Sequence, residues 1–564
     1  MARPIGIGIQ NFEKLITKHC LYIDKTDFIR EWWENKDEVT LITRPRRFGK
    51  TLNMNMLERF LSVEYAGRGE VFEGLSIWKD EKYRKLQGTY PVIFLSFADI
   101  KANTFSLARE KICMLIQEVY SKHDYLLSQG SLKEEEHRFY QRVFGEMSDA
   151  EASYSLKNLS GYLSRYYGKK VMILLDEYDT PLQEAWVYGY WREMVDFIRG
   201  LFNSTFKTNP YLERAVMTGI TRVSKESIFS DLNHLTVVTT TSMMYASSFG
   251  FTEEEVFAVL DECGMHQRCA EAKNWYDGFT FGSSRDIYNP WSILYYLKTG
   301  ELSTYWANTS SNSLIDKLVR EGSMEIKTSM ERLLKGEPLC KEIDEQIIFD
   351  QLDTDENAIW SLFLASGYLK VESYQMIEET GEELYELAIT NKEVQIMFRK
   401  MIKKWFAGSG AAYHGFLKAL LEDDIKSMNV YINKVALTTI SFFDSGKKPS
   451  VESEPERFYH GFVLGLVVEL ADHYIITSNR ESGFGRYDVI LEPRKKTDPA
   501  VIMEFKVRDF EDEASLEETA DEALKQIDKQ QYRADLEYRG IPAEQIRAYG
   551  FAFEGKKVLI KKGK

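Results

Sequence analysis

Residues 39–51 read VTLITRPRRFGKT, a short apolar run followed by a loop that ends in Gly-Lys-Thr. A helical pattern follows the loop, with Leu52, Met56, Leu57 and Phe60 on one face. A strand, a loop and a helix in this order form the layout of a phosphate-binding loop, in which backbone N–H groups wrap phosphates at a helix N-terminus. This stretch therefore predicts a nucleotide site.

Three residues of the loop match the second half of the pattern G-x-x-x-x-G-K-[ST]. Gly49 is the second glycine, Lys50 is placed to reach the β- and γ-phosphates, and Thr51 offers a hydroxyl to Mg²⁺. The first glycine of the pattern would stand at position 44, which Arg44 occupies. The predicted nucleotide-binding residues of the loop are Arg46, Arg47, Phe48, Gly49, Lys50 and Thr51.

A second apolar run, residues 171–175, leads into Asp176 and Glu177. An aspartate at a strand end can hold the water shell of Mg²⁺, and a glutamate beside it can polarise the attacking water. We therefore predict Asp176 as a cofactor-binding and metal-binding residue and Glu177 as a catalytic residue. Taken singly, each motif also fits an ordinary helix start or a solvated strand end. Their order along the chain favours ATP binding.

Apolar runs separated by helical stretches organise the first part of the chain. Four runs have the pattern of strands in a parallel, helix-covered sheet: residues 39–43, 90–95, 171–175 and 214–220. At the end of the fourth run, Thr218 or Thr221 could sense the γ-phosphate and Arg222 could stabilise charge. Equally, these residues could cap the strand and pair with a surface carboxylate.

From about Phe251 the pattern becomes mostly helical, and Thr252 with Glu255 forms a candidate capping box. From Val451 a compact α/β module begins. The fold class is therefore α/β and multidomain. Its predicted parts are a P-loop NTPase domain with a parallel sheet at 1–250, a mostly helical lid or linker at 251–450, and an α/β domain at 451–564.

Four segments within the first 290 residues resemble the AAA-ATPase-like family of P-loop NTPases. They are residues 22–26 (YIDKT), 44–51 (RPRRFGKT), 175–179 (LDEYD) and 274–279 (NWYDGF). The family's own loop is written R-P-R-R-F-G-K-[ST], so the resemblance implies that Arg44 belongs to the normal form of the site. Residues 24–26 either contact the nucleotide or brace the loop, and we favour bracing.

The last part of the chain carries a second set of reactive residues. Glu504 and Lys506 are two apart in a predicted strand and so share a face. Asp488 lies on the preceding predicted strand, which would bring it beside Glu504. Two carboxylates bind Mg²⁺ through oxygen, and a nearby lysine can orient or deprotonate the water that attacks a phosphodiester. A cross-strand salt bridge on a solvated face is the alternative.

The predicted elements of this module are a helix (457–470), strands (486–491 and 500–507), a helix (515–532) and a strand (548–553). Their order resembles the PD-(D/E)XK nuclease superfamily, although no proline precedes Asp488. The resemblance implies that Asp488 and Glu504 are metal ligands and that Lys506 is the catalytic lysine. Further candidates are Gln526 as a substrate contact and Glu456 or Glu469 as another carboxylate.

The charge balance limits the partners. With 72 Lys and Arg against 87 Asp and Glu, the net charge is −15, so the chain is not a general nucleic-acid coat. Contact with nucleic acid, DNA in the first place, is expected in a local groove. Basic residues that could line it are Arg480, Arg486, Arg494, Lys495, Lys496 and Arg508. The acidic run 511–513 is expected in a solvated loop and helix start.

The five cysteines form no C-x-x-C pair and predict reduced thiols in a cytoplasmic protein. Cys263, His266 and Cys269 lie close together but fit no closed zinc pattern. The N-terminus lacks the pattern of a signal peptide and no run reaches 18 apolar residues, so no membrane contact is expected. The oligomeric state is left open.

Two functions from different classes fit these residues. The first is an enzyme in which an ATPase site at Lys50 and Asp176 is coupled to Mg²⁺-dependent cleavage of nucleic acid by Asp488, Glu504 and Lys506. The second is a nucleotide-gated binding or regulatory module whose nuclease-like domain binds nucleic acid or a partner without cleavage. A third reading makes the loop purely structural and both sites vestigial. The sequence favours the enzyme.

Overall fold

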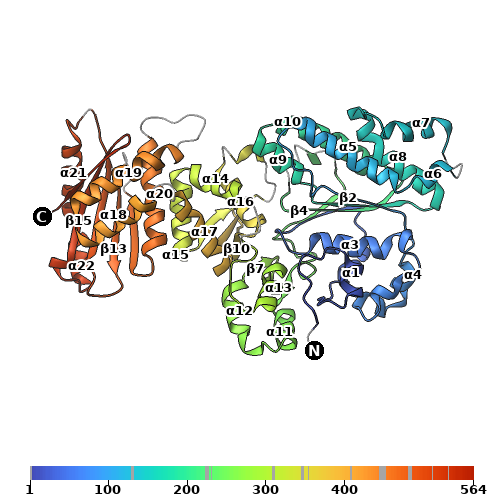
Figure 1. Ribbon diagram of the computed structural model, residues 1–564, viewed down its shortest axis with the longest axis horizontal. Helices are drawn as coiled ribbons and strands as arrows, with labels where there is room; N and C mark the ends of the chain where they lie inside the picture. Colours follow the sequence, from blue (N-terminus) through green and yellow to red (C-terminus); the bar gives the residue numbers. More distant parts are fainter. Residues whose placement is uncertain are drawn as a thin grey trace. The chain divides into compact units, whose positions relative to one another are not determined.

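The computed structural model describes residues 3–128, 132–222, 228–229, 232–307, 312–344, 349–352, 355–406, 410–443, 453–480, 486–510, 512–530 and 532–563. It divides into two compact units (Figure 1). The first unit is formed by Met1–Ser310 with Cys340–Val394, and the second by Ser311–Leu339 with Gln395–Lys564. Each unit therefore combines two separate stretches of chain. The domain boundaries at 250 and 450 remain a prediction.

The first unit contains a five-stranded parallel sheet with the order β2-β3-β4-β1-β5. Every residue of β1 and β3 is buried, as expected for parallel strands with helices on both faces. All four strands predicted for this sheet are present. The sequence pattern does not reveal β5, because it is a four-residue strand with only one fully buried residue. The strands are β1 (Val39–Thr43), β2 (Val92–Ser96), β3 (Val171–Asp176), β4 (Leu212–Gly219) and β5 (Leu235–Val238).

Helices cover both faces of this sheet (Figure 1). One face carries α1 (Phe12–Thr17), α3 (Lys50–Leu61) and α4 (Glu81–Leu86), and the other carries α5 (Phe105–Ser121), α8 (Asp149–Tyr167) and α10 (Trp191–Phe202). Met56, Leu57 and Phe60 of α3 are buried in a large core cluster with residues of β1 and β3. Because the strands are parallel, the residues that follow β1, β3 and β4 meet at one edge of the sheet.

The middle of the chain is mostly helical, with two small sheets that the sequence analysis does not predict. One has the order β6-β8-β7 and the other β10-β11-β9. The capping box is confirmed, because Thr252 Oγ1 accepts from Glu255 N and Glu255 Oε2 accepts from Thr252 N. The elements are β6 (Phe251–Thr252), α11 (Glu253–Glu262), α12 (Cys269–Tyr276), β7 (Phe279–Phe281), β8 (Ser284–Tyr288), α13 (Pro290–Thr299), β9 (Leu339–Glu342), α16 (Glu356–Ala365), β10 (Leu369–Ile377) and β11 (Glu382–Ile389).

The second unit contains a mixed sheet with the order β12-β13-β14-β15-β16, in which only β14 and β15 run parallel. Both predicted helices and the three predicted strands of this module are present, and β12 and β16 are additional strands. Its strands are β12 (Tyr474–Arg480), β13 (Arg486–Pro493), β14 (Ala500–Val507), β15 (Ile546–Glu554) and β16 (Lys557–Lys562). Its helices are α14 (Ser313–Glu321), α15 (Met324–Lys335), all but the first three residues of α17 (Lys392–Trp405), α18 (Gly410–Glu422), α19 (Ile425–Phe443), α20 (Ser453–Leu470), α21 (Leu516–Lys529) and α22 (Tyr532–Tyr538).

Two asparagines of α19 bind the backbone of the edge strand β16. Asn429 Nδ2 donates to Ile560 O (2.9 Å) and Asn429 Oδ1 accepts from Ile560 N (2.8 Å). Asn433 makes the same two bonds with Val558, at 2.6 and 3.0 Å. Each side-chain amide therefore replaces one residue of a neighbouring strand, and the helix closes this side of the sheet.

Candidate functional site

The loop between β1 and α3 ends in a glycine that starts the helix. Gly49 has φ +82° and is the N-cap of α3, a conformation that glycine adopts without steric cost. Arg47 also has a positive φ, +67°. Lys50 is the first residue of the helix. The loop thus leads into a helix N-terminus, where backbone N–H groups and the helix dipole favour an anion.

The side chain of Lys50 is buried and turned back onto the loop. Its Nζ donates to Arg44 O and Pro45 O, both at 2.9 Å. Burial lowers the pKa of Lys50, against the attraction of nearby carboxylates of which Glu177 is the strongest. Among the described residues, the hydrogen bonds of this ammonium group go to neutral carbonyl oxygens. Its charge is therefore available to an anionic ligand.

Asp176 links the loop with β3 and β4. It is fully buried at the end of β3, where Oδ2 accepts from Thr51 Oγ1 (2.7 Å) and Oδ1 accepts from Thr218 Oγ1 (2.5 Å). Burial raises the pKa of Asp176, and these two hydrogen bonds oppose the rise. The pair of Thr51 and Asp176 offers a hydroxyl and a carboxylate oxygen side by side, which are donors that suit Mg²⁺.

Glu177 follows Asp176 in a left-handed conformation, φ +54°. Its N–H donates to Thr218 Oγ1 (3.3 Å), and its carboxylate accepts from Thr180 Oγ1 (3.3 Å). A non-glycine residue in this region carries backbone strain, which is common at functional sites. The structure thus turns the backbone sharply at the residue that was predicted to be catalytic.

Arg44 stands where the pattern has its first glycine, and its side chain holds the start of the loop. The residue is fully buried and is not among those with positive φ. Its Nη1 donates to Thr43 O (2.9 Å) and Thr239 O (2.7 Å), and its guanidinium group lies 4.5 Å from the ring centre of Phe281. The side chain therefore ties the start of the loop to the segment after β5.

Phe48 holds the loop from its other end. Its ring is buried and packs edge-on against Phe279 and Phe281, with ring centres 4.8 and 5.4 Å away. Asn289 adds a hydrogen bond from Nδ2 to Arg46 O (3.2 Å). The side chain of Phe48 is thus committed to packing, and only its backbone is left for the predicted role in nucleotide binding.

Arg46 and Arg47 are exposed at the tip of the loop. Arg46 Nη2 donates to Gln183 Oε1 (3.3 Å), and the guanidinium group of Arg47 lies 4.3 Å from the ring centre of Trp291. Both cations are accessible from solvent beside the helix N-terminus. Their position is compatible with the predicted contact to a nucleotide.

Thr218 and Thr221 both bind buried carboxylates. Thr218 binds Asp176, as described above, while Thr221 donates through N (2.9 Å) and Oγ1 (3.0 Å) to Asp179 Oδ2. Asp179 is fully buried, and burial raises its pKa. The two threonines therefore serve as partners of interior aspartates. Arg222, the last residue described before a gap, is half-buried.

The segment 24–26 contacts residues that are distant in the sequence. Lys25 Nζ donates to Ser247 O (2.8 Å) and to both oxygens of Glu255 (2.7 Å). Asp24 Oδ1 accepts from Thr26 N (2.9 Å). None of these contacts reaches the loop 44–51, so its bracing by this segment stays a prediction.

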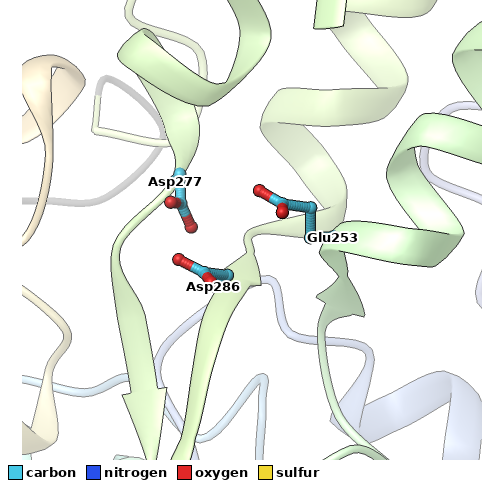
Figure 2. Close-up of side chains that lie close together, drawn as sticks. All are labelled: Glu253, Asp277 and Asp286. Atoms are coloured by element: carbon cyan, nitrogen blue, oxygen red, sulfur yellow. The ribbon is translucent and has the colours of Figure 1, made fainter. Parts of the chain in front are cut away.

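Three carboxylates that the sequence analysis did not connect lie together in the middle region (Figure 2). They are Glu253, Asp277 and Asp286, and Lys273 Nζ lies 2.5, 3.9 and 3.8 Å from their respective oxygens. Burial and then the neighbouring Asp286 raise the pKa of Asp277 to about 7. Asp277 belongs to the segment 274–279, whose sequence gives no sign that distant acids join it. Among the described residues, Cys263, His266 and Cys269 form no such group.

Asp488 and Glu504 lie directly opposite each other on β13 and β14. This is the adjacency that the spacing predicts. Each is only 4% exposed, so the salt bridge on a solvated face, the alternative considered above, does not describe them. Residues opposite each other in a sheet share a face, and Glu504 shares its face with Lys506. Two buried carboxylates and a lysine therefore occupy one face of the sheet.

Lys506 is paired with a residue that the sequence analysis placed in solvent. Its Nζ forms an ion pair with Glu513 Oε1. Glu513 is buried, at 7% exposure, and also accepts from Thr519 Oγ1 (2.6 Å). The expectation that the acidic run is solvated is therefore wrong for Glu513, although it holds for Asp512, which is exposed.

The remaining candidates of this module have varied surroundings. Glu469 forms an ion pair with Lys403 (3.0 Å). Arg494 Nε donates to Ala471 O (3.1 Å), and Gln526 lies on α21. Lys495 and Lys496 are exposed, while Arg508 is half-buried. The side chains of Glu456, Arg480 and Arg486 lie outside the described part of the chain.

Comparison with protein families gives two matches that coincide with these two sites. Residues 6–229 match the AAA-ATPase-like family, described as "Predicted AAA-ATPase", and residues 454–563 match the PD-(D/E)XK nuclease superfamily. The chain joins an AAA-ATPase-like domain to a PD-(D/E)XK nuclease-superfamily domain. ATPases and nucleases of these superfamilies typically use a nucleotide and a divalent metal.

One relative is similar to this chain over a large part of its length. It is a protein of Azotobacter chroococcum mcd 1 named "Uncharacterized protein in vnfD 5'region", 26% identical over 398 residues, which are 70% of this chain and 68% of the relative. Its name assigns it no activity. No helix in the described ranges of the chain is both long and apolar enough to cross a membrane.

Proposed function

We propose that this chain is an ATPase coupled to a metal-dependent nuclease. The observation that carries the proposal is the pairing of Asp488 with Glu504 on adjacent strands, both buried, with Lys506 on the same face. Burying two carboxylates side by side costs free energy unless a cation or proton offsets their charge. A divalent metal ion would supply that charge, and carboxylate oxygens are its preferred ligands.

In this proposal Asp488 and Glu504 hold Mg²⁺, which when bound offsets the charge that develops on the scissile phosphate. Lys506 orients the attacking water. Nucleic acid, with DNA as the first candidate, lies in a local groove because the net charge of −15 opposes broad coating. The five free cysteines support a reducing, cytoplasmic setting.

The nucleotide site contributes a separate set of roles. Lys50 and the amides at the start of α3 bind the phosphates of ATP, and the exposed Arg46 and Arg47 add charge at the loop tip. Thr51 and Asp176 bind Mg²⁺, for which their hydrogen-bonded oxygens are suitably placed. Glu177 polarises the water that attacks the γ-phosphate.

A cleavage assay tests the nuclease. Wild-type protein is incubated with linear, circular, single-stranded and branched DNA and with RNA, in Mg²⁺, Mn²⁺ or chelator, with and without ATP. We expect metal-dependent cleavage that the double substitution Glu504→Ala/Lys506→Ala abolishes. The substitution Asp528→Ala/Lys529→Ala removes the same two kinds of charge from exposed positions of α21 and should leave cleavage intact.

The same assay decides between the two functions. ATP dependence of cleavage, lost in Lys50→Ala and kept in the exposed control Lys298→Ala, would support coupling. The acidic net charge favours the second candidate, a nucleotide-gated binding module. ATP binding without cleavage of any substrate would contradict the nuclease and leave that module as the function.

A further inference from the structure

We propose that Glu513 is a positioning residue for Lys506, which it holds as a charged hydrogen-bond donor beside Asp488 and Glu504. The proposal rests on the proposed nuclease function and deepens it. The ion pair with Glu513 fixes the ammonium group of Lys506 in one place. Lys506 then orients the water or the phosphate.

The surroundings of Glu513 show that its carboxylate is built into the loop after β14. The flanking residues Asp512 and Ala514 are exposed, while Glu513 is 7% exposed. Besides Lys506, its carboxylate accepts from Thr519 Oγ1 on α21 (2.6 Å) and from Asp509 N (3.1 Å). Burial alone would raise the pKa of Glu513, but these hydrogen bonds outweigh it and lower the pKa. The group is therefore an anion with a fixed direction.

A second set of contacts closes the loop around this carboxylate. Arg508 donates through Nη2 to Ala514 O (2.7 Å) and Glu513 O (3.2 Å), and it pairs with Glu554 of β15. Ala514 N donates to Glu518 Oε2 (2.7 Å). The backbone at Glu513 and Ala514 is thus tied through Arg508 to β15 and through Glu518 to α21. In a surface ion pair both side chains are mobile, and ordering them costs most of the gain. Here the carboxylate is already held in place by other contacts.

The contact with Glu513 orders the long side chain of Lys506. A free lysine has four rotatable bonds and loses rotamer entropy when it is held in one place. A clamped anion can meet that cost before substrate binds, and preorganised donors are the ones that stabilise a transition state best. Glu504 and Lys506 are two apart on β14, so fixing the lysine also fixes its relation to the carboxylates.

The first test compares Glu513→Gln with Asp512→Asn, its exposed neighbour. We expect Glu513→Gln to lower kcat/KM for metal-dependent cleavage by about 10- to 100-fold, the usual effect of losing a residue that orients a reactive group, with the loss mainly in kcat. Glu513→Asp, which restores the charge, should recover part of the lost rate, and Asp512→Asn should leave kcat and KM unchanged.

A double-mutant cycle separates positioning from general damage. If Glu513 acts through Lys506, then Lys506→Ala/Glu513→Gln should cleave no more slowly than Lys506→Ala alone. An equal further loss in the Lys506→Ala background, an unchanged rate in Glu513→Gln, or a faster Glu513→Gln enzyme would each overturn the proposal.

A measurement that needs no cleavage keeps this inference apart from the proposed function. In the full chain with isotopically labelled lysine, the side-chain NMR signal of Lys506 is assigned by its loss in Lys506→Arg, and its relaxation reports the mobility of the side chain. We expect this mobility to rise in Glu513→Gln and to stay near the wild-type value in Glu513→Asp and Asp512→Asn. Unchanged mobility in Glu513→Gln would refute the positioning role even if cleavage is found. Absence of cleavage with increased mobility would refute the nuclease but not the positioning of the lysine.

Discussion

The guanidinium group of Arg44 binds backbone carbonyl oxygens on two separate segments, at Thr43 and Thr239. Phe281 covers it. A glycine at this position could make none of these contacts. The arginine that departs from the general phosphate-loop pattern therefore stabilises the loop from within the core.

Restoring the general pattern with Arg44→Gly should consequently weaken the domain. We expect the free energy of unfolding to fall by about 2–4 kcal/mol, because two or more buried carbonyl oxygens lose their donor. The affinity for ATP should fall as well. Chemical denaturation measures the change in stability, and calorimetric ATP titration measures the change in affinity. Arg192→Gly, at an exposed position of α10, should cost only about 1 kcal/mol through helix propensity. A more stable Arg44→Gly protein would contradict this account.

Glu393 is a second buried charged residue with a measurable signature. Its Oε1 accepts from Trp306 N (2.6 Å) and its Oε2 from Ser292 Oγ (2.8 Å), and burial raises its pKa to about 7. Since the folded state then binds a proton more tightly than the unfolded state, the stability that this proton contributes is lost as pH rises from about 4.5 to about 7.

Glu393→Gln should remove this pH dependence. The free energy of unfolding of the wild type should fall over that interval by at most about 1.4 kcal/mol per pH unit relative to the variant, which is the limit for one proton. Denaturation of both proteins across the interval provides the measurement. Parallel stability curves would show that Glu393 does not titrate there.

At the scale of elements, continuous apolar runs reveal the buried strands β1, β3 and β14, because both faces of these strands are covered. The period of two residues also suffices to bring Asp488 opposite Glu504. The strands β5 and β16 lie at sheet edges, and charged or half-buried residues hide them. Glu513 could not be found in this way. Nothing in the local sequence separates it from Asp512, and its role arises only when the loop closes onto β14.

The N-terminus of α11 offers a test at the same scale. Glu255 both completes the capping box and binds Lys25, so the cap joins a local motif to a distant segment. Thr252→Ala should lower the free energy of unfolding by about 1 kcal/mol. Thr252→Asp should keep most of the wild-type stability, because aspartate also caps well. Equal stability of Thr252→Ala and wild type in denaturation would rule out a contribution of the cap.

At the scale of the whole molecule, the two compact units carry the two sites separately. We expect calorimetry to show two unfolding transitions, since chains of several domains seldom unfold in one step. ATP with Mg²⁺ should raise the midpoint temperature of the first unit's transition only. The free energy of unfolding of that unit should rise by about 2.7 kcal/mol when the ligand concentration is 100 times its Kd. Lys50→Ala should abolish the shift and Lys298→Ala should not. A shift of both transitions together would show that the units unfold as one.

The two asparagines of α19 have a consequence for any shortened form of this chain. A fragment that begins at residue 451 keeps β16 but loses Asn429 and Asn433, which occupy the backbone groups of Val558 and Ile560. That strand edge would then be open to pairing with a strand edge of another copy. Self-association of such a fragment into aggregates would therefore reflect a missing cover and not a failure of its own sheet to form.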